Sequence, residues 1–408
     1  MIGYPAYKKS SIEWICNIPA SWDVLPLFSV GSESRISNKG MVEDNLLSLS
    51  FGKIVRKDIE TLGGLLPESF ETYQVVNEND IVFRLTDLQN DKRSLRSAIC
   101  VERGIITSAY IAVTPKKIRP KYFHYLMRAY DEAKVFYNLG SGMRQSLKFS
   151  ELKRLPIIIP STQEQEQIER FLDKKLEEIN YLIEAKKDFL VLLKEKRCAL
   201  VDASVRHNET KMMRLGYCAS QKKRPISYSE STEYIPIGLY NRGRGIFRKV
   251  PTLGRHLGDS HFFYIQPGDL ILSGQFAWEG AAALVGSENS GCVASHRYPI
   301  LRGMEGVLET SYLWAYLTTR EGDFLLNEHS RGSAGRNRPL NINGLMKAKI
   351  PVPSMRLQQE ISKFIEEERK ILEAIKKFEK HLRELGTTLV YNSVVGAVDL
   401  RSYEMEVE

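Results

Sequence analysis

The chain carries two copies of one sequence pattern, and equivalent positions lie 193 residues apart. Each copy has a proline and a serine, then a glutamine, then three apolar residues. These positions are Pro160, Ser161, Gln165, Ile168, Phe171 and Leu172 in the first copy, and Pro353, Ser354, Gln358, Ile361, Phe364 and Ile365 in the second. The same offset relates Gly142, Leu147, Phe149 and Leu152 to Gly335, Leu340, Ile342 and Leu345. A fixed offset indicates a duplicated structural unit, and 408 residues are too many for one ordinary core.

Weaker matches extend the duplication toward the start of each half, at slightly smaller offsets. The segment 79–82 (Asn-Asp-Ile-Val) resembles 268–271 (Gly-Asp-Leu-Ile), and 104–108 resembles 291–295. A drifting offset indicates surface loops of different length between the matched elements. The chain therefore has the order head, helix, head, helix.

The segments after the two prolines are predicted to be long helices. Residues 161–204 contain no glycine or proline, and Leu and Ile recur there mostly every three or four positions among Glu and Lys. The apolar seam is Leu172, Leu176, Ile179, Ile183, Leu190, Leu193 and Leu200, repeated by Ile361, Ile365, Leu372, Ile375, Leu382, Leu385 and Leu389. Ser161 and Glu164 give the first helix a capping-box start, whereas the second helix begins at Pro353-Ser354 without that acid.

Each helix alone would expose an apolar stripe to water, so we expect the two to pack against each other in antiparallel orientation. Two independent helical hairpins, or a zipper between two copies of the chain, remain alternatives. The heads are predicted to be rich in strands, because β-prone runs at 81–83, 99–101 and 109–113 are separated by turn residues. A helix is predicted at 120–137, with a counterpart near 310–326.

The predicted fold class is α+β, with two mixed strand-rich heads separated by two long α-helices packed as an antiparallel coiled-coil spacer. The predicted segments are a first head at 1–155, a first helix at 156–208, a second head at 209–350, a second helix at 351–396 and a tail at 397–408.

The sequence lacks the patterns of several catalytic and membrane classes. It has no apolar run near the roughly 20 residues of a membrane span, no secretory signal, no Walker A motif and no paired cysteines or histidines at metal-binding spacing. Glu184-Ala185-Lys186 has a nuclease-like form but lies in a predicted helix where Glu and Lys alternate, so a helix surface is favoured. We expect a non-catalytic, cytoplasmic protein that binds no metal or cofactor itself.

Basic and amide side chains gather in the loops of the heads, and the formal net charge is +8. Arginine suits guanine edges and phosphates, and Asn and Gln suit adenine edges, so these loops are predicted to bind duplex DNA. The candidates in the first half are Arg84, Gln89, Asn90, Lys92, Arg93, Arg96, Arg144, Gln145 and Lys148. Those in the second half are Lys222, Lys223, Arg224, Arg242, Arg244, Arg331, Arg336, Asn337 and Arg338. Solvated loops without a ligand are the alternative.

The order of these features resembles the specificity (S) subunits of Type I restriction-modification systems. The motifs that carry the resemblance are Ile12-Glu13-Trp14 through Trp22, the segment from Arg84 to Tyr110, Gly-Asp-Leu-Ile at 268–271, Pro-Ser-x-x-x-Gln at both helix starts and Val395 to Leu400. One departure is Gln358-Gln359, where the family usually has Glu-Gln.

The resemblance implies two target recognition domains, each reading one part of a split, asymmetric DNA sequence, with the spacer fixing the gap. It implies two modification (adenine methyltransferase) subunits and two restriction (ATP-dependent endonuclease) subunits as partners, with S-adenosylmethionine, ATP and Mg²⁺ bound by those partners. A recognition subunit of a Type II-like restriction-modification enzyme and a helical scaffold that does not contact DNA are the alternatives.

Overall fold

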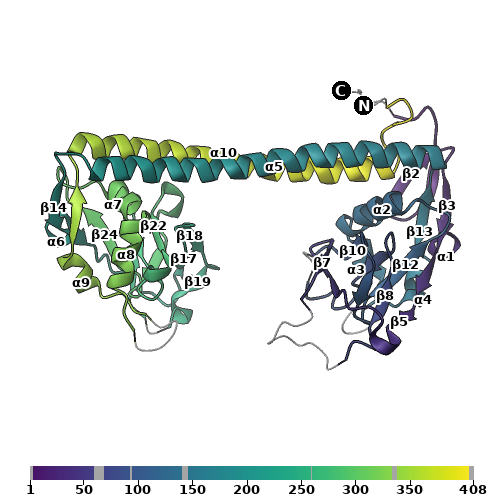
Figure 1. Cartoon of the computed structure of the whole chain (residues 1–408), viewed down its shortest axis with the longest axis horizontal. Helices are drawn as coiled ribbons and strands as arrows, with labels where there is room; N and C mark the ends of the chain where they lie inside the picture. The colour runs from purple at the N-terminus through teal and green to yellow at the C-terminus, as the bar shows by residue number, and fades with distance from the viewer. Residues whose placement is uncertain are drawn as a thin grey trace. The chain divides into compact units, whose positions relative to one another are not determined.

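The computed structural model describes residues 3–58, 69–91, 94–139, 146–258, 260–332 and 338–403. The chain forms two compact units. Unit 1 is Met1–Glu184 with Phe378–Glu408, and unit 2 is Ala185–Lys377 (Figure 1). Helix α5 (Thr162–Val205) begins in unit 1 and ends in unit 2, and α10 (Met355–Val394) begins in unit 2 and ends in unit 1.

Unit 1 is built around a four-stranded antiparallel sheet in the order β10-β9-β12-β4. These strands are Ser97–Ile99, Ile81–Phe83, Ile111–Pro115 and Gly31–Ser34. A three-stranded sheet joins β11 (Gly104–Ile106), β8 (Gln74–Val76) and β5 (Ile36–Ser37). Three strand pairs complete it: β1 (Tyr7–Ile12) with β2 (Ile15–Pro19), β3 (Asp23–Pro26) with β13 (Pro156–Ile159), and β6 (Leu47–Ser50) with β7 (Lys53–Arg56).

Unit 2 repeats this plan. Its four-stranded sheet has the order β15-β24-β21-β22, with strands Ala219–Gln221, Ile300–Gly303, Leu270–Leu272 and Ala282–Leu284. The pairs are β14 (Lys211–Arg214) with β25 (Lys349–Val352), β16 (Glu233–Tyr234) with β19 (Thr252–Leu253), β17 (Ile237–Leu239) with β18 (Ile246–Arg248), and β20 (Phe262–Tyr264) with β23 (Val293–Ser295). Read from the other edge, the unit 1 sheet is β4-β12-β9-β10, so the two sheets share one topology and the predicted duplication is confirmed.

The short helices also correspond. Unit 1 has α1 (Leu27–Val30), α2 (Pro120–Glu132), α3 (Val135–Leu139) and α4 (Phe149–Leu152), and unit 2 has α6 (Leu215–Cys218), α7 (Thr310–Leu317), α8 (Arg320–Glu328) and α9 (Ile342–Lys347). Both helices predicted at 120–137 and 310–326 are thus split in two. Lys134 interrupts the first with a φ of 58°, and Thr319 caps α8 by accepting a hydrogen bond from the Gly322 amide.

A buried aspartate precedes β9 in unit 1 and β21 in unit 2. The Oδ2 atoms of Asp80 and Asp269 accept hydrogen bonds of 2.9 Å from the amides of Asn77 and Gln266. The residue before each aspartate has positive φ, 71° at Asn79 and 85° at Gly268. The turn signals in the sequence therefore mark the same tight turn twice.

Within each unit, a part of α5 packs against a part of α10 in antiparallel orientation. In unit 1, Ile179 and Ile183 share the core with Leu382 and Leu389. A Cβ on Gly386 would lie 3.3 Å from the Leu176 side chain, so that side chain packs closely against α10 there. The predicted pairing of the two helices is confirmed within both units.

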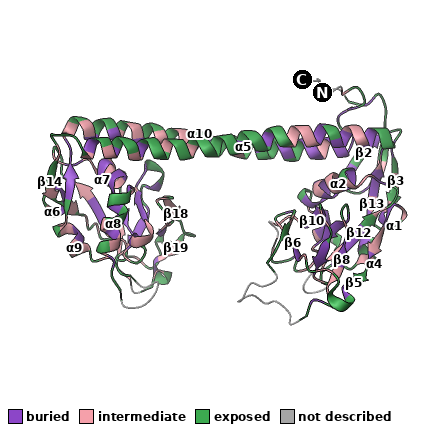
Figure 2. Ribbon diagram, viewed as in Figure 1, coloured by how far each residue is buried: buried purple, intermediate pink, exposed green. Residues whose placement is uncertain are grey.

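In unit 2, the positions of α5 that face inward differ from those predicted. Val201 shares the core with Ile361 and Ile365, whereas Leu200 is exposed, as is Leu385 of unit 1. The sequence places Leu200 and Leu385 in the seam, and both placements are wrong. In α5 the inward positions are Arg197, Val201 and Ser204, at spacings of four and three that leave Leu200 facing outward. Figure 2 shows mostly exposed residues around the middle of α5, in agreement with the row of exposed positions at 184–189.

The glutamine of each Pro-Ser-x-x-x-Gln motif joins the start of a long helix to the start of a head helix. Gln165 donates to the Pro160 carbonyl and accepts from the Arg119 amide at the start of α2, both at 2.9 Å. Gln358 makes the same bonds with Pro353 and with Glu309 at the start of α7, at 2.9 and 2.8 Å. Gln358 thus stands for Gln165.

Under the 193-residue offset, Leu357 of the second copy is equivalent to Glu164 of the first. Glu164 completes the predicted capping box with Ser161: the carboxylate accepts from the Ser161 amide at 3.2 Å, and the Glu164 amide donates to the Ser161 hydroxyl at 3.3 Å. A leucine can accept no such bond. Among the helices of the described residues, none is both long and apolar enough to span a membrane.

Candidate nucleic-acid interface

Three loops that are far apart in sequence meet on unit 2. The turn between β17 and β18 is tied to the turn after β21, because the amides of Arg242 and Gly243 donate to the carbonyls of Glu279 and Gly280, both at 2.8 Å. The segment before α9 joins them through the Leu340 amide, which donates to the Gly274 carbonyl at 2.9 Å. The predicted DNA-binding residues Arg242, Arg244 and Arg338 therefore belong to one surface.

Two arginines on this surface lie over aromatic rings. The guanidinium carbon of Arg338 is 4.8 Å from the ring centroid of Trp278, and that of Arg244 is 5.2 Å from the ring of Tyr240. Stacking fixes a guanidinium plane while its N–H groups remain available to acceptors. Gln275 and Phe276, in the same turn, are exposed. The cluster can present donors and flat apolar surface together, which suits base edges and phosphates.

A groove of about 1320 Å³ adjoins this surface within unit 2. Its wall includes Arg242, Arg244, Trp314 and, on α10, Arg369. Arg369 pairs with Glu288, and acidic side chains line the groove alongside the basic ones. Because of this mixed charge, the arginine-bearing rim suits a polyanion better than the groove as a whole does.

Unit 1 brings the corresponding loops together. The Leu147 amide donates to the Leu85 carbonyl at 2.9 Å, as Leu340 does to Gly274 in unit 2. Gln89 and Asn90 are exposed in the turn after β9, and Lys148 is exposed at the start of α4. Arg84 is half-buried.

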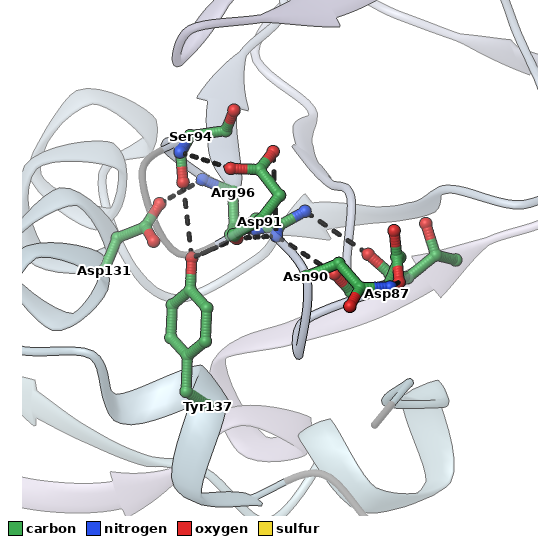
Figure 3. Close-up of polar contacts among 8 residues, drawn as sticks. Asp87, Asn90, Asp91, Ser94, Arg96, Asp131 and Tyr137 are labelled. Atoms are coloured by element: carbon green, nitrogen blue, oxygen red, sulfur yellow. Dashed lines mark hydrogen bonds and ion pairs between the residues drawn. The ribbon is translucent and has the colours of Figure 1, made fainter. Parts of the chain in front are cut away.

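Arg96 is predicted to bind DNA, but the structure contradicts this prediction. Its side chain is fully buried; Nε donates to the Tyr137 hydroxyl at 3.2 Å and Nη1 to the Thr86 carbonyl at 3.3 Å, and Nη2 reaches the Asp91 carbonyl (Figure 3). The guanidinium satisfies loop carbonyls from inside and so holds the turn that carries Gln89 and Asn90. Arg96 is a positioning residue for that turn.

The same cluster contains a buried carboxyl group. Burial raises the pKa of Asp131 to about 6, although the Arg96 amide, Arg128 and Lys134 act in the opposite direction. One carboxylate oxygen accepts from the Arg96 amide, and the other has no hydrogen-bond partner in the part of the chain that the structure describes. Burial therefore disfavours the charged form of Asp131.

Arg224 is half-buried and has a structural partner. The sequence predicts it to bind DNA, yet its guanidinium makes two bonds to the carboxylate of Asp269, at 2.7 and 3.1 Å. Asp269 is fully buried and is also 2.8 Å from Arg302. A buried carboxylate requires such partners, so Arg224 supports the core of unit 2. Its neighbour Lys223 is exposed and Lys222 is half-buried.

The remaining candidates divide into two groups. Arg331 is exposed beside Gly332. Lys92, Arg93, Arg144, Gln145, Arg336 and Asn337 lie outside the described residues. The sequence did not single out Tyr240, because its ring joins the surface only through the fold of the turn. Within the described ranges, no group of three or more His, Cys, Asp or Glu side chains could hold a metal ion.

Residues 98–190 match the family model of the Type I restriction modification DNA specificity domain. The fold is similar, with a TM-score of 0.56 and 15% identity, to a chain from work on the "structural basis underlying complex assembly and conformational transition of the type I R-M system", over 93% of this chain and 99% of that chain. Residues 98–190 therefore carry the pattern of a DNA specificity domain, within a chain that forms two compact units. The family model confirms the predicted resemblance for residues 98–190, and for the chain as a whole the comparison shows a similar fold.

Two further solved structures are similar to this chain. The HsdS subunit from Thermoanaerobacter tengcongensis matches with a TM-score of 0.48 and 16% identity, over 93% of this chain and 98% of that chain. The Type-I restriction-modification system S subunit from M. genitalium matches with a TM-score of 0.45 and 14% identity, over 95% and 98%. No curated protein sequence matches the chain.

Proposed function

We propose that the chain is the DNA sequence-specificity subunit of a Type I restriction-modification complex, in which each unit reads one part of a bipartite, asymmetric duplex target. The observation that carries the proposal is that the two units share one backbone arrangement but expose different loop residues on it. Both units have the buried aspartate turn at Asp80 and Asp269 and the loop-to-loop bond at Leu147 and Leu340. The exposed side chains on that arrangement differ, with Gln89 and Asn90 in one unit and Gln275 and Phe276 in the other. Two heads of one design with different contact residues suit a site whose two parts differ.

The chemistry of the complex belongs to partners in this proposal. Two modification subunits, with adenine methyltransferase activity, and two restriction subunits, with ATP-dependent endonuclease activity, would bind S-adenosylmethionine, ATP and Mg²⁺. Exposed large apolar side chains on the long helices support a role in docking. They are Tyr181, Leu182, Phe378 and Leu385 in unit 1, and Phe189, Val191, Leu192 and Leu200 in unit 2. We propose that the modification subunits cover these positions and that the chain itself catalyses no reaction.

The test is purification of the full chain with its native partners through an affinity tag, followed by binding to duplex DNA at several salt concentrations. Contacts to phosphate release counterions, so we expect log affinity to fall linearly with log salt, by roughly 0.9 per phosphate contacted. Co-purification of an adenine methyltransferase is the second expected result. A complex that lacks this enzyme and shows no salt-dependent binding to DNA would contradict the proposal and support a scaffold.

A further inference from the structure

The hairpin β6–β7 of unit 1 ends in an exposed phenylalanine held in an unusual backbone conformation. Ser50 pairs with Lys53, so Phe51 and Gly52 form a two-residue turn. Both have positive φ, 47° at Phe51 and 73° at Gly52. Asparagine and glycine are preferred in such turns, whereas a bulky aromatic residue rarely takes this conformation. The Phe51 side chain is 79% exposed, so packing within the chain does not account for its presence.

A side chain of α2 supports this turn. Arg128 of α2 donates a hydrogen bond from Nη2 to the Gly52 carbonyl at 2.7 Å. A Cβ on Gly52 would lie 2.3 Å from Nη1 of Arg128, so the guanidinium fills the space under the turn. The backbone that carries Phe51 is therefore fixed, and strain that surrounding contacts maintain is typical of functional positions.

The hairpin β17–β18 of unit 2 is its structural counterpart. The Lys57 amide donates to the Leu46 carbonyl at 2.8 Å, and the Lys249 amide donates to the Pro236 carbonyl at 2.8 Å. Leu46 and Pro236 each also form an isolated parallel bridge, with Ile105 and Val293 respectively. Both hairpins end in Arg-Lys, at 56–57 and 248–249.

The two tips are the parts that differ. In unit 1 the turn is Phe51-Gly52, whereas in unit 2 a longer turn carries Tyr240, Arg242 and Arg244. The unit 2 tip belongs to the candidate DNA surface, and the equivalent tip in unit 1 was not among the residues that the sequence predicted.

From this equivalence we infer that Phe51 is a specificity-determining residue of unit 1, making an apolar contact with the bases of duplex DNA. The inference rests on the proposed function. The thymine methyl group is the apolar feature of base edges in the major groove, and phenylalanine can contact it. Lys53 and Lys57 on the same hairpin are exposed and cationic, as contacts to the flanking phosphates require. The two hairpin tips then read the two parts of the target with different chemistry.

The variant Phe51→Asn tests this inference, because Asn-Gly is a favoured pair for this turn and should leave the melting temperature unchanged or higher. The probe is a library of duplexes with randomised sequence, offered to the tagged complex with its native partners. For the wild type we expect enrichment of a bipartite sequence. For Phe51→Asn we expect base preference to be lost at one or two adjacent positions in one part only, with affinity for the wild-type sequence reduced about 10-fold.

The matched control is Arg244→Ala on the other hairpin, which should alter preference in the opposite part of the sequence. Unchanged preference and affinity within twofold for Phe51→Asn, beside an intact bipartite wild-type result, would overturn the inference and leave the proposed function standing. A lowered melting temperature accompanying the loss would also overturn it, because position 51 would then be structural. If the wild type enriches no sequence, the proposed function fails and the inference fails with it.

Discussion

Arg197 of α5 forms a buried ion pair with Glu368 of α10, with Nη1 2.5 Å from both carboxylate oxygens. The guanidinium carbon of Arg197 also lies 4.5 Å from the ring centroid of Trp314 on α7. One arginine thus joins both long helices of unit 2 to the head of that unit. Removal of either charge leaves the other buried without its partner, which is costly.

We expect Arg197→Met and Glu368→Gln each to lower the free energy of unfolding by about 3–5 kcal/mol. The double variant Arg197→Met/Glu368→Leu should recover most of that loss, because no buried charge remains. Thermal and denaturant unfolding of the three variants measure this. A double variant as unstable as the single ones would show that the ion pair is not the reason for their instability.

The two motif glutamines should have equal structural roles. Gln165→Leu and Gln358→Leu each leave a buried carbonyl and a partly buried amide without this partner, so each should cost about 1–3 kcal/mol. The matched controls are Gln163→Leu and Gln359→Leu, at exposed positions on the same helices. Hydrogen exchange of the two units separates the effects, because each substitution should loosen its own unit. Equal stability of Gln165→Leu and Gln163→Leu would contradict this role.

Asp131 should make unit 1 less stable as the pH rises. Its pKa is raised to about 6 by burial, so the folded state holds a proton that the unfolded state, with a pKa near 3.9, has released. Stability therefore falls as the pH rises from about 4 to about 6, by up to about 3 kcal/mol, and stays reduced above that range. Asp131→Asn should lack this pH-dependent loss. Parallel stability curves for wild type and Asp131→Asn between pH 4 and pH 8 would contradict the assignment.

Substitutions of Arg96 and Arg338 should have different effects, the first on stability and the second on DNA binding. Arg96→Ala removes the donors for several loop carbonyls and should lower the melting temperature. Arg338→Ala should leave the melting temperature unchanged and weaken DNA binding by about 1–3 kcal/mol, which is about 5-fold to 150-fold. Arg338→Lys keeps the charge but not the planar fork, so partial loss is expected if the contact is to a base. A stable Arg96→Ala protein would contradict its role as a positioning residue.

The sequence predicts the duplication and the long helices well, because an apolar period sustained over some forty residues leaves few alternatives. It does not separate Arg96 from Arg338, since both lie in short polar loops among serine, asparagine and arginine. Burial of Arg96 depends on Tyr137 and on the loop around Asp91, which come together only in the folded unit. The ion pair of Arg224 could not be predicted for a related reason: its partner Asp269 is distant in sequence.

The turns of the two hairpins are a second case in which residues acquire their role only in the folded unit. Phe51 carries no charge or amide, so composition alone does not mark it as a contact residue. Its equivalence to the turn that carries Arg242 and Arg244 follows from matching backbone bonds at Lys57 and Lys249, which no local sequence pattern reveals.

In the proposed function, this chain directs modification to a two-part DNA sequence. Methylated bases across the host genome can be mapped by sequencing, with the gene present and with the gene deleted. We expect deletion to remove methyl-adenine from one bipartite, asymmetric motif and to leave other methylation intact. Identical methylation in the two genomes, in cells that express the chain and its partners, would contradict it.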